Sequence, residues 1–325
     1  MKKAGFRAIL IHSLLALFIA SCPSYASEQE PPSYAFSLNH GTKYEEFYWT
    51  ISGNPTPNIL SELEWRDMEL QHTQLSLAAS QANFITRFEF DYGSINSGEN
   101  QDSDYSGNNR TQEWSRSLAD VSGETIGINL LMGYEFPLTP TDRFLLTPMF
   151  GFYKYEQRLG MLNGTKVING FDTNSNSSIT SDIPLVGLDS SYDTNWNTKW
   201  LGAEFTWNLH DRISLVFQHE YHFDIDFSAT ANWNLRSNLE HPVSFTHDAD
   251  EGEGHRISFS VHYQILPSMK INAFYDYYQI EVTDGLDRTY FSDNTEGTTR
   301  LNIAETESSS FRIGLSWTPG ASDKD

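Results

Sequence analysis

The sequence predicts an all-β fold, a single closed antiparallel transmembrane β-barrel of about ten strands. Three observations favour it. Apolar and polar residues alternate over unusually long segments, the polar positions are charged in one segment after another, and short and long connections alternate along the chain.

The alternation has a period of two, which a β-strand uses to separate its side chains onto two faces. Every second residue from Ile257 to Ile265 is apolar, and Arg212 to Phe227 repeats the pattern. Strands in soluble domains centre on about five or six residues. These segments are longer, and a tilted strand that crosses a bilayer needs about 9 to 11 residues.

The polar face of these segments favours a barrel over a soluble sandwich, because a sandwich does not need a charge on each exposed face. In a membrane barrel the apolar side chains face lipid and the charged ones line a wet lumen. We therefore expect ten ionisable side chains to point inward: Arg87, Glu89, Asp91, Glu135, Glu204, Glu220, His222, Asp224, Asp226 and Asp276.

Ten segments carry the strand pattern, and a change of register near Arg66 to Met68 predicts a β-bulge in the second. Four connections are short and five are long and polar, as in outer-membrane barrels with short periplasmic turns. The predicted strands are Ser33 to Ser52, Ile59 to Ala78, Phe84 to Ile95, Glu124 to Phe136, Phe144 to Gly160, Asn197 to Leu209, Arg212 to Phe227, Glu253 to Ile265, Met269 to Thr283 and Ile303 to Trp317.

Aromatic residues near the predicted strand ends suggest girdles at the two membrane interfaces, where amphipathic rings settle. A sugar-stacking platform is the alternative. The residues concerned are Tyr134, Phe136, Tyr153, Tyr155, Trp196, Trp200 and Trp207.

The first residues have the features of a secretory signal. Positive charges at positions 2, 3 and 7 precede an apolar run from Ala8 to Ala20, and small residues up to Ala26 offer a cleavage site. We expect residues 1–26 to be a cleaved signal peptide and residues 27–325 the outer-membrane barrel. The only cysteine, Cys22, also fits a lipoprotein signal.

Composition excludes several classes of function. The chain carries 43 acidic and 21 basic residues, a formal net charge of -22, so nucleic acid is not an expected partner. Neither a zinc-ligand spacing nor a nucleotide-binding motif is present, and we expect no metal. Outer-membrane lipid is the expected surrounding.

Asp102 and Asp104 stand one residue apart in the polar stretch Glu99 to Asn109, which we expect to be an outer loop. Neighbouring carboxylates can share a proton or hold a water molecule. The alternative is a solvated acidic loop, because Asp, Asn, Ser and Gly are common in any exposed loop.

The order of several short motifs resembles the omptins, ten-stranded outer-membrane proteases of Gram-negative bacteria. The motifs are Leu60 to Trp65, Asp102 to Tyr105, Met132 to Tyr134 and Trp200 to Gly202. The resemblance implies extracellular loops and a catalytic carboxylate pair in the Asp-x-Asp-aromatic motif.

Further site residues follow from the same resemblance. Asp102 and Asp104 would be the catalytic pair, while Glu45 and Glu113 fall where the family places acids that bind a basic substrate residue. The resemblance also makes lipopolysaccharide a possible cofactor, and we expect no other.

The sequence departs from the omptin pattern after the seventh strand. The family carries Asp-x-His there, whereas this chain reads Thr230-Ala231-Asn232-Trp233. His241, or His247 with Asp248 and Asp250, could reach the groove from later in the same loop.

Three functional hypotheses remain open from the sequence. The first is an omptin-like surface protein whose acidic extracellular groove binds cationic peptides or other ligands, with proteolysis in doubt because the Asp-His pair is missing. The second is an omptin-type endopeptidase that cleaves next to basic residues. The third is a small outer-membrane channel or porin.

Overall fold

The structure, a computed structural model, describes residues 31–320. The predicted signal peptide, including Cys22, lies outside the described residues. Within them, no helix is long and apolar enough to cross a membrane.

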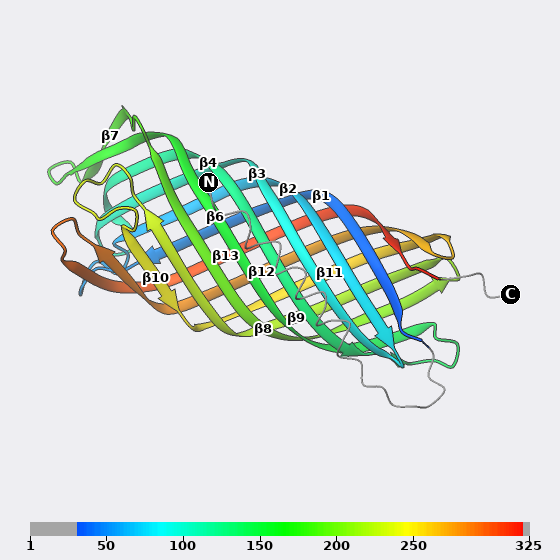
Figure 1. The fold of residues 1–325 in the computed structure, drawn as a ribbon. Coiled ribbons are helices and arrows are strands. Elements are labelled where there is room, and N and C mark those ends of the chain that lie inside the picture. The colour runs from blue at the N-terminus through cyan, green and yellow to red at the C-terminus, as the bar shows by residue number, and fades with distance from the viewer. Residues whose placement is uncertain (1–30, 321–325) are drawn as a thin grey trace, which may run out of the picture. The chain divides into compact units, whose positions relative to one another are not determined.

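Ten long antiparallel strands, which lie between Ser33 and Trp317, form a closed ring (Figure 1). The last strand of the ring pairs with the first from Phe36 with Trp317 to Ile51 with Leu301, which closes the sheet. The ring strands are, in order, β1 (Ser33–Ile51), β2 (Ser61–Gln81), β3 (Phe84–Gly107), β4 (Thr111–Tyr134), β6 (Phe144–Asp172), β8 (Asp189–His210), β9 (Ile213–Asn232), β11 (Glu251–Leu266), β12 (Met269–Tyr290) and β13 (Glu296–Trp317).

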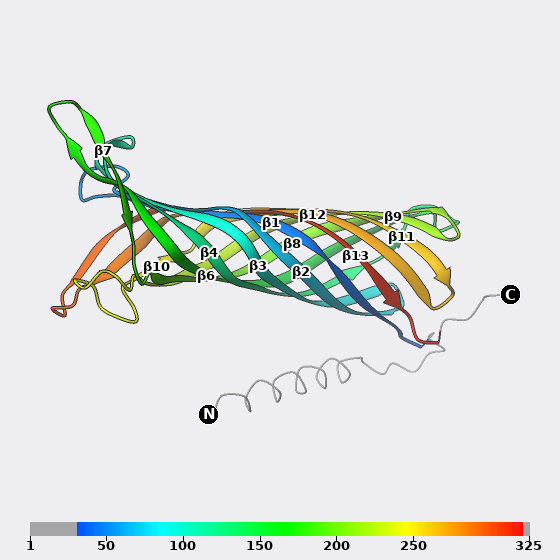
Figure 2. The same cartoon turned by 90° about the horizontal axis from the view of Figure 1, so that it is seen from above.

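Three short strands complete the sheet. β5 (Phe136–Pro137) and β7 (Ser177–Pro184) pair with β6. β10 (Phe245–Ala249) lies between the C-terminal ends of β9 and β12 and pairs with both. β7 belongs to a hairpin that stands off one end of the barrel (Figure 2). This end carries the two longest connections, from β6 to β8 and from β9 to β11, and we call it the outer end.

The predicted barrel of about ten strands is confirmed, but the strands are longer than predicted. β3 continues through the stretch expected to be a loop, so Asp102 and Asp104 lie on a strand. Asp102 pairs with Leu63 of β2 and with Ser117 of β4. Backbone hydrogen bonds to two neighbouring strands hold this segment extended, whatever the polarity of its side chains.

The outside of the barrel wall carries a band of apolar side chains near the short-turn end, which is the end opposite the outer end. On β1 the exposed side chains include Tyr34, Phe36 and Leu38, and the next exposed charge along the strand is Glu46. On β8 the exposed Leu201 lies just below Lys199. The band spans about nine residues of a tilted strand, as a bilayer requires.

Inside this band charged groups line the lumen around a cavity of about 390 Å³, and most of the residues predicted to point inward are among them. Arg312 is 1% exposed and contacts both Asp91, at 3.5 Å, and Asp276. Arg256 lies 3.4 Å from the same Asp276 carboxylate, and Arg87 lies 3.1 Å from Glu204. The network satisfies buried charges that would otherwise be costly in a membrane-enclosed bore.

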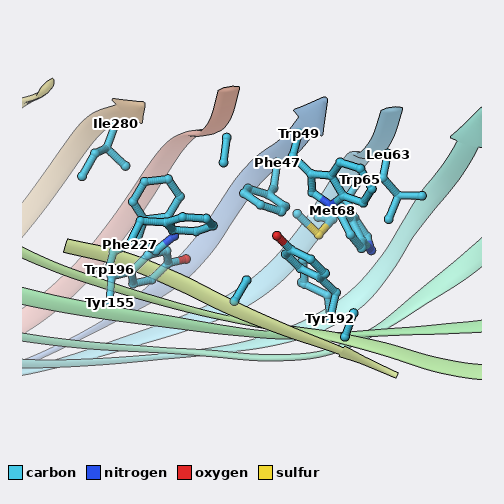
Figure 3. Packing of buried hydrophobic residues seen from close by; sticks show 14 of the residues in the cluster. Phe47, Trp49, Leu63, Trp65, Met68, Tyr155, Tyr192, Trp196, Phe227 and Ile280 are labelled. Carbon is cyan, nitrogen blue, oxygen red and sulfur yellow. The ribbon is translucent and has the colours of Figure 1, made fainter. Parts of the chain in front are cut away.

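Above the band the lumen changes character and is filled by aromatic side chains. Figure 3 shows them pointing toward one another from strands on different sides of the barrel. Five of the largest are no more than 1% exposed: Phe47, Trp65, Tyr192, Trp196 and Phe227. We call this cluster the aromatic plug. Apolar side chains therefore face outward mainly within the band. Beyond it, toward the outer end, large apolar side chains point inward and form a buried core like that of a soluble protein.

The plug corrects part of the predicted aromatic girdles. Trp196, Trp200 and Tyr155 are at most 2% exposed and lie in the lumen, not at a membrane interface. Tyr153 packs against them. Period-two alternation places a side chain on one of two faces, but it does not say where along the barrel the inner face becomes apolar.

Two of the β-bulges among the described strands bear on the predicted inward faces. The predicted bulge in β2 is confirmed, because the register with β3 shifts between Arg66 and Glu69. A second bulge in β9 was not predicted, and Asp224 adopts a φ of 50° there. Asp224 and Asp226 are therefore exposed on the outside, which corrects their predicted lumen position.

The buried charge network generates a stability prediction. Replacing Arg312 with alanine leaves Asp91 and Asp276 without their shared cation, so we expect a loss of about 3–5 kcal/mol of unfolding free energy. Arg66, exposed on the outer wall beside Glu99, is the control, and Arg66→Ala should cost under about 1 kcal/mol. Urea unfolding of the detergent-folded barrel measures both, and equal effects would contradict the network's role.

The contacts across the lumen generate a second prediction. The charge network around Arg312 and the aromatic plug each close the bore, so the protein should give no stable ohmic current steps in a planar bilayer. Steps of constant conductance, seen at protein concentrations that insert single barrels, would require an open path and would favour the channel hypothesis.

Candidate ligand-binding site

A cavity of about 290 Å³ lies at the outer end of the barrel, next to the aromatic plug. Five ring strands or their ends, the short strand β10 and the β9–β10 connection contribute to its wall. The lining residues are Trp49, Ile51, Leu60, Ser61, Asp102, Asp104, Trp114, Trp233, Arg236, Asn238, Leu239, Phe245, Asp287 and Thr289.

One wall of the cavity carries the predicted pair of aspartates. Residues two apart on a strand point to the same face, and Asp102 shares its face with Leu63, which is fully buried in the core. Asp102 lies eighteen residues beyond Phe84 along β3. At the usual rise and tilt this is about 40 Å from the short-turn end, well outside a membrane band of about 25 Å.

A third aspartate, Asp287 of β12, lines the same cavity. It is 2% exposed, and its carboxylate lies 3.1 Å from His247 Nε2 and accepts a hydrogen bond from Thr299 Oγ1 at 3.0 Å. The hydroxyl of Tyr192 lies 2.8 Å from the other ring nitrogen, Nδ1 of His247.

An Asp-His pair is therefore present, but not where the omptin pattern would place it. His247 and Asp287 are direct cross-strand partners on β10 and β12. The sequence suggests His247 with Asp248 and Asp250 as an alternative, whereas in the structure His247 pairs with Asp287. No local signal could have revealed this, because β10 is a five-residue strand within a segment expected to be a loop.

The surroundings of His247 limit what it can do. The imidazole is fully buried, does not line the cavity, and has a partner at each nitrogen. A general base must reach the proton it removes within about 3.2 Å or through one water. Of the two residues, Asp287 lines the cavity and His247 does not.

Aromatic side chains form much of the remaining lining. The ring of Trp233 lies edge-on to Phe245 at 4.7 Å, and Trp49 meets the same phenylalanine at 5.9 Å. Trp114 adds a further indole. Aromatic faces beside carboxylates attract cations, because the ring quadrupole and the negative charge act in the same direction.

Arg236 is the only lysine or arginine among the lining residues. Its Nη2 lies 3.8 Å from Asp104 Oδ2, and its side chain is 47% exposed. Nearby, the ammonium group of Lys166 lies 6.0 Å from the centre of the Trp114 ring.

The environment shifts the titration of both aspartates. Burial raises the pKa of Asp102 to about 7, the Asp104 carboxylate adds to the shift, and Arg236 opposes it. Burial also raises the pKa of Asp104, with Ser61 and Arg236 opposing. The pair therefore gains negative charge as pH rises through neutrality.

The two predicted substrate-binding glutamates lie elsewhere. Glu45 is 2% exposed inside the barrel, where Lys43 lies 2.5 Å away and Tyr155 donates a hydrogen bond to it at 2.7 Å. Glu113 forms two contacts with Arg116, at 2.7 and 2.8 Å. Neither lines the cavity.

The remaining candidate from the sequence, His241, does not contribute to the cavity. His241 is exposed and lies 2.8 Å from the Asn232 side chain. Across residues 31–320, no three metal-ligating side chains gather in a group that could hold an ion.

Comparisons with known proteins agree with the barrel. The family model described as Protochlamydia outer membrane protein (Pom) matches residues 37–318. The outer membrane protease OmpT of Escherichia coli is similar in structure, with a TM-score of 0.75 over 90% of this chain and 99% of that one, at 12% identity. At this identity the likeness shows the fold alone.

Other solved barrels are less similar. The translocator domain of the autotransporter NalP from Neisseria meningitidis has a TM-score of 0.34 at 9% identity, over 96% of this chain and 95% of that one. The toluene transporter TodX of Pseudomonas putida has a TM-score of 0.32 at 9% identity, over 90% of each chain. No curated protein matches the chain in sequence.

The shifted aspartate generates a pH prediction. The folded pKa of Asp102 lies above its unfolded value of about 3.9, so its contribution to stability is present at low pH and is lost as pH rises through about 7. The difference of about three between the folded and unfolded pKa values corresponds to about 4 kcal/mol, so Asp102→Asn should stabilise the protein by up to that amount at pH 8 and have little effect at pH 4.

Urea unfolding at the two pH values measures this difference. Asp211→Asn, in the exposed turn between β8 and β9, serves as a control and should show no such pH dependence. An Asp102→Asn effect that is the same at both pH values would contradict the shift.

Proposed function

This chain belongs to the Protochlamydia outer membrane protein family, and we propose that it is a surface receptor whose outer cavity binds a cationic side chain of a peptide. It is an outer-membrane β-barrel with the omptin fold. The proposal concerns what the cavity at the outer end of that barrel does.

One observation carries the proposal: Asp102 and Asp104 share a wall of an aromatic-lined cavity outside the membrane band. Two carboxylates at this spacing supply the negative charge. The indole and phenyl faces supply cation–π attraction that is stronger in a partly desolvated site than in water. Asp287 at the same cavity adds a further acidic group.

Peptide hydrolysis is the second candidate, and the raised pKa of Asp102 favours it. A carboxyl group that titrates near pH 7 suits general acid–base work. The buried partners of His247 favour ligand binding instead, because the imidazole has no free nitrogen with which to accept a proton. Binding is therefore our first choice.

A direct binding measurement tests the proposal. The detergent-folded barrel is titrated with a fluorescent peptide containing two adjacent arginines, at low and physiological salt. We expect micromolar binding that weakens about tenfold or more in Asp102→Asn/Asp104→Asn. Affinity should rise between pH 6 and pH 8, because the pair ionises over this range.

Matched controls make the result specific. Asp211→Asn should bind like the wild type, and a peptide with glutamates in place of the arginines should not bind. Binding that ignores salt and the double substitution would contradict the proposal. Peptide cleavage that disappears in Asp102→Ala would establish the hydrolytic candidate instead.

A further inference from the structure

Two cations that belong to the chain itself lie at or near the cavity. Arg236 lies 3.8 Å from Asp104, and Lys166 lies over the Trp114 ring at 6.0 Å. Both cations also lower the pKa of Asp102 and Asp104, against the effect of burial. Each kind of cation-binding group in the cavity thus has an internal partner.

We propose that Arg236 is a tethered cation that occupies the Asp102–Asp104 wall in the free protein and is displaced by the cationic group of a ligand. This inference rests on the proposed function, since it concerns binding to the same cavity. Arg236 would compete with the ligand's cationic group for the two aspartates and so lower the affinity of the site for every cationic ligand.

The contact between Arg236 and Asp104 is suited to release. At 3.8 Å it is longer than a hydrogen bond, whereas Arg110 donates to Glu62 at 2.7 Å and Arg116 to Glu113 at 2.7 Å. A long ion pair whose cation is half exposed is only weakly stabilising. Displacement by a better-placed cation therefore has a small cost.

The backbone around Arg236 is fixed, so the side chain alone can move. The Arg236 amide donates to the Trp233 carbonyl at 2.9 Å, and the Leu239 amide donates to the Arg236 carbonyl at 2.9 Å. Leu239 also forms a bridge with Phe291. A flexible side chain on an anchored segment can leave the wall without reorganising the cavity.

The position of Arg236 also separates it from the other cation. Arg236 contacts Asp104 on the carboxylate wall. Lys166 lies over the Trp114 ring and does not line the cavity. At a pH high enough to ionise the aspartate pair, removing either charge makes the cavity more negative. Only removal of Arg236 also frees the wall itself, so its effect on ligand affinity should be the larger of the two.

The test compares four forms of the detergent-folded barrel: the wild type, Arg236→Gln, Lys166→Gln and Arg110→Gln. The probe is the fluorescent diarginine peptide at physiological salt and about pH 8, where the aspartate pair is more fully ionised. Arg236→Gln should bind it about two- to fivefold more tightly than the wild type, the gain expected on losing a weak internal competitor. Lys166→Gln should gain less, and Arg110→Gln should match the wild type.

Weaker or unchanged binding by Arg236→Gln, with measurable binding by the wild type, would overturn the inference while leaving the proposed function intact. Equal gains in Arg236→Gln and Lys166→Gln would overturn it too, because they would reduce Arg236 to a distant charge.

A second readout needs no ligand and judges the inference if no form binds the peptide. The aspartates are labelled with ¹³C at the carboxyl carbon, and Asp104→Asn assigns the pair. Arg236→Gln should raise the apparent pKa of the pair, because it removes the neighbouring positive charge. An unchanged titration would show that Arg236 does not occupy the wall.

Discussion

Pairing of β1 with β13 is the interaction on which the rest of the structure depends, because it leaves the ring without an open edge. A strand in lipid must satisfy every backbone group within the protein, and only closure achieves this. Once the ring is closed, a strand needs apolar side chains on only one of its two faces at each level along the barrel axis: the outer face within the membrane band and the inner face above it. That freedom allows the same ten strands to hold charges inside the membrane band and an aromatic core above it.

The change from charged lumen to aromatic plug prepares the candidate site. Trp49 and Phe245 belong to the buried core and also line the cavity, so the plug gives the cavity a rigid, apolar floor. Asp102 and Asp104 stand beside it on a strand held on both sides by neighbours. Burial against this floor raises the pKa of Asp102 to about 7, which links the packing of the barrel to the charge of the site.

Alternation was sufficient to predict the closed barrel, its strand number and the bulge after Arg66, because each is a local consequence of which face a side chain takes. It failed at Asp224, where an unmarked bulge reverses the faces, and it could not reveal that His247 meets Asp287 across two strands. The carboxylate pair was found by its spacing and resemblance. Arg236 was not, since only the folded β9–β10 connection brings it to Asp104.

Cross-linking of the closing seam tests this account most directly. Tyr44 of β1 and Ser309 of β13 are cross-strand partners on the outer face, so Tyr44→Cys/Ser309→Cys in a Cys22→Ser background should form a disulfide within one chain. His40→Cys/Thr73→Cys, which joins β1 to β2, is the matched control. Closure predicts that both pairs cross-link within a chain. A control that cross-links beside a seam that does not, or that links only separate chains, would contradict it.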